Sequence, residues 1–436
     1  MKRWRVQRDI IGGIFLLVTT SSVEGERAYP LGCSQRDPSY YNYDAYTFPP
    51  PGSNVKSTDA YLLVRRLGSG KFSDVFEAVD VDLERKLPTT QINHQVDPRA
   101  LVVLKCLKPV SDRKIRREIL ILSHCSALPN LARFIGLVVV PPTLQQNNHS
   151  PSLTIPVMPT LVLKHAGVTS QWLCHQATTT KPSLHLHSKL NKHLTEYEIQ
   201  YYLYHLLIAL DALHSCGIMH RDVKPRNVLI NRQNLNIPHD LGEPSPLMLI
   251  DLGLADFFLP NTRYNVRVAS RHFKSPELLI GYEYYDYAID IWGVGCILAG
   301  LLLRKEPFFR GMDNLDQLGK IIGVLGTSDL LSYMTKYKVE LTPELRTVVA
   351  KYVVRGGQKQ SWASMIPAGC PLPSANALDL LNKLLVYNHD DRLTAKQAIQ
   401  HSFFDAVRDR VNEEIRQRAI AEKAKIQSSF FNNDTF

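Results

Sequence analysis

The sequence has few cysteines and no long apolar run. Its seven cysteines are an odd number and include no Cys-x-x-Cys pair, which argues against a disulfide framework and against a zinc site. The apolar run at residues 10–18 is too short to cross a bilayer. The apolar segment 289–303 carries Asp290 near one end and is followed by Arg304, so a buried core helix is expected there. No membrane span is predicted.

Charge of one sign does not collect in long blocks either. The 436-residue chain has a net charge of +10, but its acidic and basic residues are interspersed, so a nucleic-acid partner is not expected. An acidic peptide substrate would explain the same excess. With 44% hydrophobic residues, the chain has material for one large or two ordinary globular domains.

The amino terminus has the layout of a secretory signal peptide, with basic residues before the run at 10–18 and small residues up to Gly25. Glycosylation sequons at Asn148 and Asn433 fit that route, although such triplets are common by chance. The alternative is an apolar start to a nuclear or cytosolic enzyme, so localisation stays open. Residues 1–25 are predicted as the signal peptide and residues 26–60 as an amino-terminal segment.

Hydrophobic periodicity then divides the chain into a strand-rich part and a helix-rich part. Strands are expected at residues 61–66, 73–79, 101–107, 134–140, 161–163 and 247–250. Helices are expected at residues 113–126, 195–214, 289–303, 315–325, 377–385 and 395–399, with Thr195 and Glu198 as a capping box. Inserts at residues 83–98, 141–159, 177–192 and 236–246 are predicted to be loops.

These elements predict an α+β fold with two lobes. Residues 61–163 would form a small antiparallel β-sheet lobe with one helix, and residues 168–404 a larger, mainly α-helical lobe, joined by a hinge at 164–167. A ligand is expected in the cleft between the lobes. The tail, residues 405–436, alternates Arg and Glu in a pattern typical of an exposed helix.

A glycine-rich turn separates the first two predicted strands. Its sequence runs from Gly68-Ser69-Gly70-Lys71 to Val75, and its glycines would let backbone amides approach phosphate oxygens. In isolation an ordinary hairpin turn explains it as well. No helix follows the turn, so it is not a dinucleotide-binding fingerprint.

A buried lysine and a helix glutamate form the next candidate pair. Lys105 ends the apolar strand at 101–107, and a buried ammonium needs a counter-ion, for which Glu118 is the natural candidate. The pair would hold Lys105 against the nucleotide phosphates. The alternative is a purely structural salt bridge.

The segment from His220 to Asn227, followed by Asp251-Leu252-Gly253, has the residues that phosphoryl transfer requires. Asp222 would orient the attacking hydroxyl and accept its proton, and Lys224 would neutralise charge on the transferred group. Asn227 and Asp251 offer oxygen ligands to magnesium.

Two further carboxylates are expected to support this segment. Asp290, at the start of the buried helix, could accept hydrogen bonds from backbone amides of the catalytic loop. Glu277 and Arg392 are expected to form a buried bidentate ion pair.

In this order and spacing, the motifs resemble those of the eukaryotic protein kinase family. Within that family, the segments 217–225, 264–277 and 304–309 resemble the casein kinase 2 alpha type, and the similarity covers residues 61–404. The resemblance implies transfer of the γ-phosphate of ATP, with Mg²⁺, to serine or threonine followed by acidic residues. It also implies an amino-terminal brace for the activation segment, residues 264–277, a regulatory beta subunit in a tetramer, and a nuclear and cytosolic location.

The resemblance also implies the nucleotide-binding residues. They are Gly68, Ser69, Gly70, Lys71, Val75, Val103, Lys105, Leu163, Ala166 and Leu229. Val103, which accompanies GTP use in this type, is retained. Leu252, Leu163 and Lys164 depart from the Trp, Phe and Glu usual in this type, so GTP use stays open.

Basic residues are expected to contact acidic substrates. Arg267, Arg271 and Lys274 follow Asp251 and would line the groove beside the acceptor, while Arg116 and Arg117 belong to a basic cluster on the helix opposite. A solvated helix face or a nuclear-localisation patch would explain either cluster. The rival functions are a kinase with proline-directed or priming-dependent specificity and a pseudokinase that acts as a scaffold.

Overall fold

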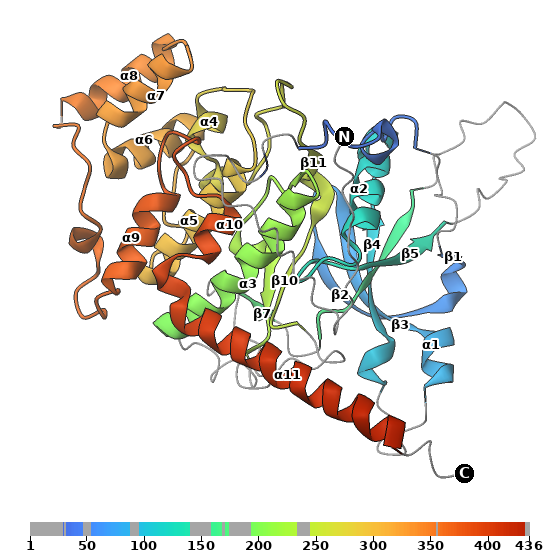
Figure 1. Ribbon diagram of the computed structural model, residues 1–436. Coiled ribbons are helices and arrows are strands. Elements are labelled where there is room, and N and C mark those ends of the chain that lie inside the picture. Colours follow the sequence, from blue (N-terminus) through green and yellow to red (C-terminus); the bar gives the residue numbers. More distant parts are fainter. Residues whose placement is uncertain are drawn as a thin grey trace, which may run out of the picture.

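The computed structural model describes residues 29, 32–46, 54–87, 96–139, 158–167, 171–173, 193–232, 245–354 and 356–431. The predicted signal peptide, both sequons, the insert at 177–192 and most of the inserts at 141–159 and 236–246 lie outside these residues. In the described ranges, no helix is both long and apolar enough to cross a membrane. The strands gather on one side of the molecule and most helices on the other (Figure 1).

The small lobe is built on a six-stranded sheet with the order β1-β5-β6-β4-β3-β2. Its strands are β1 (Val55–Lys56), β2 (Tyr61–Ser69), β3 (Ser73–Asp80), β4 (Leu101–Leu107), β5 (Phe134–Val138) and β6 (Thr160–Lys164). Neighbouring strands are antiparallel except β1, which pairs in parallel with β5. Helix α2 (Asp112–Cys125) buries Ile115, Ile119 and Leu122, the residues whose spacing predicted it.

A short second helix in this lobe, α1 (Val81–Lys86), was not predicted. The loop predicted at residues 83–98 is therefore wrong at its start, because residues 83–86 are helical. Helix α1 begins there because the Asp80 side chain accepts a hydrogen bond from the backbone N–H of Leu83 at 3.1 Å, which caps the first turn.

The large lobe is chiefly helical. Its helices are α3 (Glu196–Ser215), α4 (Pro276–Leu279), α5 (Ala288–Leu302), α6 (Asn314–Leu325), α7 (Ser328–Lys336), α8 (Pro343–Val353), α9 (Ala375–Leu384), α10 (Ala395–Ile399) and α11 (Asp405–Phe431). Its short strands are β7 (Gln171–Trp172), β8 (Ile218–Met219), β9 (Val228–Ile230), β10 (Leu247–Leu249) and β11 (Asp256–Phe257). The predicted capping box of Thr195 and Glu198 is present at the start of α3.

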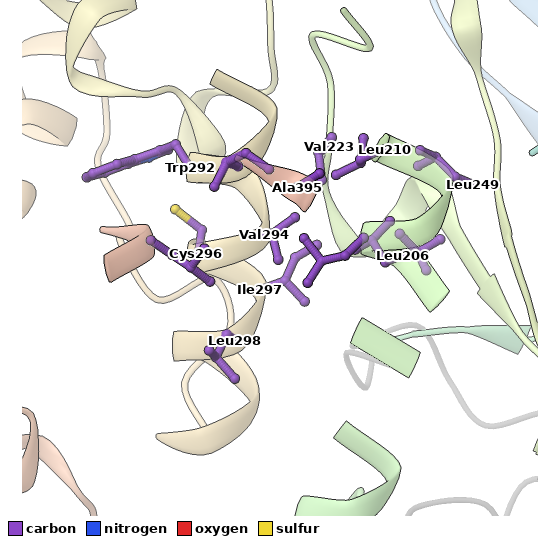
Figure 2. Packing of buried hydrophobic residues seen from close by; sticks show 14 of the residues in the cluster. Leu206, Leu210, Val223, Leu249, Trp292, Val294, Cys296, Ile297, Leu298 and Ala395 are labelled. Atoms are coloured by element: carbon purple, nitrogen blue, oxygen red, sulfur yellow. The ribbon is translucent and has the colours of Figure 1, made fainter. Parts of the chain in front are cut away.

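Helices α3 and α5 form the centre of the large-lobe core. Figure 2 shows Leu206 of α3 near Val294 and Ile297 of α5, with Val223 of the catalytic loop beside Leu210 of α3. Full burial of one such side chain contributes about 1.5–3 kcal/mol. Because α5 is buried along nearly its whole length, it is a rigid support for the loop that packs on it.

The amino-terminal segment packs where the two lobes meet. The Tyr40 ring stacks on His124 of α2 with ring centroids 3.9 Å apart, and its hydroxyl donates to the carbonyl of Cys216, just after α3, at 2.9 Å. The backbone N–H of Cys33 donates to the carbonyl of Phe258 at 2.9 Å. Residues 32–46 therefore connect α2 with the start of the segment that follows β11.

Candidate active site

A cleft of about 470 Å³ lies between the lobes. Its upper wall includes the glycine-rich turn between β2 and β3 and Lys105 on β4, and its lower wall includes Asn227 and Asp251. These residues are up to about 180 positions apart in the chain, and the fold brings them to one cavity.

A cluster of three charges occupies the inner part of the cleft. The Lys105 ammonium lies 2.7 Å from Glu118 Oε1 and 2.8 Å from Asp251 Oδ1. Burial by itself would lower the pKa of Lys105, but the charges of Glu118 and Asp251 outweigh it and raise that pKa above its ordinary value. Lys105 therefore favours its charged form and contacts groups from both lobes.

Asp251 is held in an unusual backbone conformation. Its φ is +67°, in the left-handed region, and its side chain accepts a bond from the N–H of Gly253 at 3.4 Å. Surrounding protein would raise the pKa of this carboxyl, but Lys105 outweighs that effect and lowers the pKa to about 2. The side chain is nevertheless 47% exposed, because it faces the open cleft.

Gly253 lies against this cluster. A Cβ atom built there would be 3.3 Å from both Asp251 Oδ1 and Glu118 Oε2 and 3.4 Å from Lys105 Nζ. Such contacts are tighter than ordinary van der Waals packing. The three charged groups therefore pack against residue 253 at a distance that suits glycine, which has no Cβ atom.

The catalytic-loop carboxylate, Asp222, is fixed by three donors. Its Oδ1 accepts the backbone N–H of Ser270 at 2.8 Å, and its Oδ2 accepts Lys224 Nζ at 2.5 Å and Asn227 Nδ2 at 3.1 Å. Lys224 Nζ also donates to Ser270 Oγ at 2.8 Å. The base candidate is thus pre-oriented by the loop and by the activation segment together.

Asp290 anchors the backbone of this loop, as predicted. Its two oxygens accept the N–H groups of His220 and Arg221 at 2.8 and 2.7 Å. Burial would raise the pKa of Asp290, but the hydrogen bond from His214 and the charges nearby lower it. Gly293 lets α5 approach this loop, since a Cβ there would be 2.7 Å from the carbonyl of Val223.

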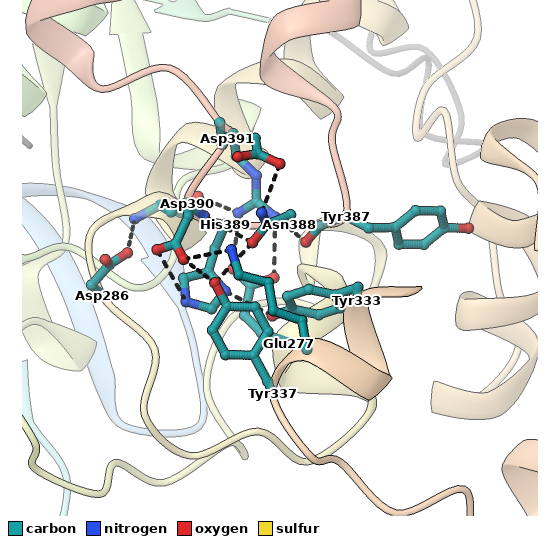
Figure 3. A network of polar contacts seen from close by, with 12 residues as sticks. Glu277, Asp286, Tyr333, Tyr337, Tyr387, Asn388, His389, Asp390 and Asp391 are labelled. Carbon is teal, nitrogen blue, oxygen red and sulfur yellow. Dashed lines mark hydrogen bonds and ion pairs between the residues drawn. The ribbon is translucent and has the colours of Figure 1, made fainter. Parts of the chain in front are cut away.

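The predicted pair of Glu277 and Arg392 is present and fully buried. Arg392 donates to both carboxylate oxygens, at 2.8 and 3.2 Å, and both side chains are 0% exposed. Figure 3 shows Glu277 within a wider network that includes Tyr333 and His389, whose hydroxyl and Nδ1 are 2.8 Å apart. The network holds the end of the activation segment against the helical core.

The oxygens of Asn227 and Asp251 suit a divalent cation. Asn227 uses its Nδ2 to donate to the carbonyl and the carboxylate of Asp222, and Asp251 uses Oδ1 for Lys105, so one oxygen of each side chain has no partner among the described residues. One carboxylate and one amide oxygen are ligands that a hard cation accepts. No cluster of three or more His, Cys, Asp and Glu able to hold a metal occurs in the described ranges, so phosphate and water oxygens would complete the shell.

Nearly all predicted nucleotide-binding residues line the cleft. They are Gly68, Ser69, Gly70, Val75, Val103, Lys105, Leu163, Ala166 and Leu229. Lys71 does not line it, and its ammonium lies 5.5 Å from the centre of the Phe72 ring. A Cβ at Gly68 would meet nothing within 4 Å, so the turn leaves open space for a bound group.

Lys274, for which substrate binding is predicted, is buried within the activation segment. Lys274 is only 8% exposed, and its ammonium donates to the carbonyls of Val266 and Val268 within the activation segment. Burial lowers its pKa. Lys274 therefore supports the backbone of this segment and does not face a substrate.

Arg117 is also structural. Its guanidinium lies 2.9 Å from Asp256 Oδ2, the same oxygen that Arg221 contacts at 2.9 Å. The Asp256 carboxylate thus joins α2 to the catalytic loop. Both side chains of the Arg117–Asp256 pair are only 13% exposed, so the predicted contact of Arg117 with substrate would require this pair to open.

Three predicted substrate-binding cations remain at the surface. Arg116 donates to the carbonyl of Asp44 at 3.2 Å, and Arg271 donates to the carbonyl of Met312. Arg267 is exposed, and its guanidinium has no partner among the described residues. Of the five predicted cations, Arg267 is the one whose charge is open to a ligand.

Sequence reasoning missed Ser270, Arg226 and Trp172. Ser270 is directly bonded to Asp222 and Lys224, and its place six residues after the start of segment 264–277 was the available signal. Arg226 lies within the catalytic loop but resembles no expected ligand. Trp172 lies beside an undescribed insert, so no periodicity marked it.

One comparison with known proteins bears on this site. A family model described as the protein kinase domain matches residues 61–404, about four fifths of the chain. The match covers both walls of the cleft and every site residue discussed above.

Proposed function

This chain belongs to the protein kinase family, and from that premise we propose that it is a magnesium-dependent serine/threonine kinase of the casein kinase 2 alpha type. As a protein kinase it binds ATP, uses a divalent metal and phosphorylates proteins. Serine/threonine specificity, a preference for acidic residues after the acceptor, and magnesium as the metal are parts of the proposal. The observation that supports it best is the approach of Lys105, Asp251 and the Asp222 loop at one cleft.

The acceptor side of the reaction depends on Asp222. Its carboxylate would accept a hydrogen bond from the substrate hydroxyl, orient it and take its proton. Lys224, already 2.5 Å from Asp222 Oδ2, is close enough to balance charge on the phosphoryl group as it moves. Its second bond, to Ser270 Oγ, ties this geometry to the activation segment.

The nucleotide side depends on the opposite wall. Lys105, oriented by Glu118, would bind phosphate oxygens, and the backbone amides of the turn at Gly68 and Gly70 would cover the phosphates. Magnesium bound by Asn227 and Asp251 would neutralise phosphate charge during transfer. GTP as a second donor remains a prediction from the resemblance, because Leu163, Lys164 and Leu252 change the lining of the cleft.

The preference for acidic residues after the acceptor is supported by Arg267. This exposed guanidinium lies three residues before Ser270, whose N–H contacts Asp222. An acidic side chain close behind the acceptor could therefore pair with it. Arg271 is a second candidate, if its bond to the Met312 carbonyl is exchanged for a carboxylate.

A regulatory beta subunit is a further part of the proposal. Strand β2 lies at an edge of the sheet and exposes Leu62, Leu63 and Val64, each at least half exposed. Adjacent exposed apolar residues are a common feature of interaction surfaces. A Leu62→Asp variant should lose binding to a beta subunit and keep peptide phosphorylation; unchanged binding would argue against this surface.

Phosphorylation of matched peptides tests the function. A Ser-Asp-Glu-Glu peptide should be phosphorylated with Mg²⁺ and ATP, and Asp222→Asn should remove at least about 99% of the activity, since a positioned base contributes about 100-fold or more. Persistent activity in that variant contradicts the site. A proline-directed peptide, if preferred, supports the rival specificity. Nucleotide binding without metal-stimulated turnover supports the pseudokinase alternative.

The two alternatives for residues 1–25 need a separate experiment. Amino-terminal sequencing of the protein from its own cells distinguishes them. Cleavage after the run at 10–18 places the enzyme in the secretory pathway, and an intact leader supports a nuclear and cytosolic enzyme.

A further inference from the structure

A second cavity, of about 170 Å³, shares no lining residue with the cleft between the lobes. Its lining comes from Tyr29 and from the large lobe, chiefly the end of α3, the start of α5 and the segment that leads into α10. Asp390 and Gln397 on this lining are exposed, whereas His214 and Ile291 are each 1% exposed. The cavity therefore reaches from the surface to buried side chains.

Two buried polar atoms on this lining lack a hydrogen bond. Neither His214 Nδ1 nor Tyr287 Oη has a partner among the described residues, and the two residues are 1% and 7% exposed. Their ring centroids are 4.7 Å apart. Buried polar groups in proteins are nearly always bonded, so these two atoms indicate a group that binds in the cavity.

Asp290 fixes the bonding role of His214. His214 Nε2 lies 2.9 Å from Asp290 Oδ2, and the same carboxylate accepts the backbone N–H groups of His220 and Arg221. Because this carboxylate is an acceptor, Nε2 carries a proton, and Nδ1 of the neutral ring is itself an acceptor. A hydroxyl group is the simplest partner, since it donates to Nδ1 and accepts from Tyr287 Oη.

The walls around these two atoms are aromatic. The centroid of the Tyr287 ring lies 5.4 Å from that of Tyr29 and 4.9 Å from that of Phe258, and all three rings line the cavity. Aromatic rings pack against one another at such distances. A dry cavity of about 150 Å³ binds benzene, so this cavity has room for one further ring.

The charged groups on the lining are already bonded within the protein. Arg392 donates to Glu277 at 2.8 Å, and Asp390 Oδ2 lies 3.0 Å from Lys336 Nζ. Asp286 Oδ1 accepts a backbone N–H from the start of α5 at 2.9 Å. A neutral ligand therefore suits the cavity better than an ion does.

We propose that this cavity binds a small neutral phenol, a single aromatic ring whose hydroxyl donates to His214 Nδ1 and accepts from Tyr287 Oη. The site goes beyond the proposed function and does not depend on it, because no residue that lines the cleft between the lobes takes part. His214 uses its other nitrogen to bond Asp290. The ligand would thus contact a ring that is one hydrogen bond away from the anchor of the catalytic loop.

Binding of phenol and toluene to the full chain tests the site, since toluene has the ring without the hydroxyl. Saturation-transfer NMR should give a dissociation constant of about 1 mM or lower for phenol. Tyr287→Phe keeps the aromatic ring and removes its hydroxyl, so it should weaken phenol binding about fivefold, the effect of one hydrogen bond. Toluene should bind this variant at least as tightly as it binds the wild-type protein.

A matched control is Tyr202→Phe. Tyr202 is 0% exposed, its hydroxyl also has no partner among the described residues, and it does not line this cavity. Neither tyrosine has a hydrogen bond to lose, so both variants should fold, which their melting temperatures check. Tyr202→Phe should leave phenol affinity at the wild-type value. An equal loss in both variants would mean a general effect of removing a buried hydroxyl and would overturn the site.

Three further results would overturn the site. Failure of phenol to bind saturably would mean that the cavity holds water only. An unchanged phenol affinity in Tyr287→Phe would mean that phenol binds elsewhere. Displacement of phenol by Mg²⁺ and ATP, or a raised KM for ATP in its presence, would place phenol in the cleft between the lobes. None of these results bears on the kinase assignment, which peptide phosphorylation tests separately.

Discussion

Two ion clusters in this kinase have similar chemistry and opposite surroundings. Arg392 and Glu277 are 0% exposed, and the guanidinium also donates to the carbonyls of Val386, Tyr387 and Ala288. Lys105, Glu118 and Asp251 lie at the cleft, where the Asp251 side chain is 47% exposed. The first cluster uses its bonding capacity within the protein, and the second keeps a carboxylate oxygen open to solvent.

The difference in exposure explains why one ion cluster stabilises the fold and the other can bind a ligand. Burial opposes ionisation of both Glu277 and Arg392, yet their mutual attraction lowers the pKa of Glu277 and raises that of Arg392, so the pair stays charged. A buried pair of this kind is costly to break but has nothing left to bind. At the cleft, partial exposure weakens the stabilisation and leaves Asp251 able to bind a cation.

The largest effect is expected when the buried pair is broken. Arg392→Met leaves the Glu277 carboxylate buried without its counter-ion, which should lower the free energy of unfolding by about 3–5 kcal/mol. Urea denaturation followed by fluorescence measures this change. The control is the double variant with Glu277→Leu, which removes both charges and should recover at least half of the loss. If both variants are equally unstable, the pairing is not the cause.

Disrupting the cluster of Lys105, Glu118 and Asp251 should reduce activity more than stability. Lys105→Met removes the group that would bind phosphate, so kcat/KM should fall about 100-fold to 1000-fold. The melting temperature should fall less than in Arg392→Met, because water reaches Asp251 and can replace part of the lost interaction. Peptide phosphorylation and thermal unfolding on the same samples check both effects. A loss of stability as large as that of Arg392→Met would contradict the comparison.

Gly253 allows a subtler disturbance of the same cluster. In Gly253→Ala the new methyl group would be 3.3 Å from Asp251 Oδ1 and Glu118 Oε2, which must move by a few tenths of an ångström. A cost of about 1 kcal/mol is expected for such overpacking, or about a fivefold fall in kcat/KM. Thermal unfolding should change little. An unchanged kcat/KM would show that the cluster tolerates displacement.

The contrast also explains what the sequence could predict. Lys105, Glu118, Asn227 and Asp251 occur in spaced motifs, and the structure brings them to one cleft, where Asn227 is bonded to Asp222. Helices α2, α3, α5, α6, α9 and α10 followed from their apolar patterns, whereas α7 and α8 were not predicted. Helix α1 and the parallel strand β1 were missed, since they are short and depend on a single cap or a two-residue pairing.

The substrate-binding cations were harder to predict. A count of basic residues cannot show whether a side chain is already paired. Arg117 pairs with Asp256, which is distant in the chain, and Lys274 donates to a backbone carbonyl. Arg226 was missed for the opposite reason. Its availability depends on the absence of a partner among the described residues, which a sequence cannot show.

The smallest effect is expected at an exposed pair between the amino-terminal segment and α2. Asp44 Oδ1 accepts Arg113 Nε at 3.0 Å, with side chains 59% and 66% exposed, so Asp44→Asn should change the free energy of unfolding by less than about 1 kcal/mol. The Asp44 carboxylate nevertheless pairs with Arg113 on α2, and an acidic substrate could bind this guanidinium if Asp44 were absent. Removing it should raise kcat/KM about twofold for a peptide with a long acidic run after the serine, and 0.5 M salt should abolish the gain because screening weakens exposed pairs. A gain that persists in salt, or a lower kcat/KM, would mean that Asp44 acts through the amino-terminal segment and not through competition for Arg113.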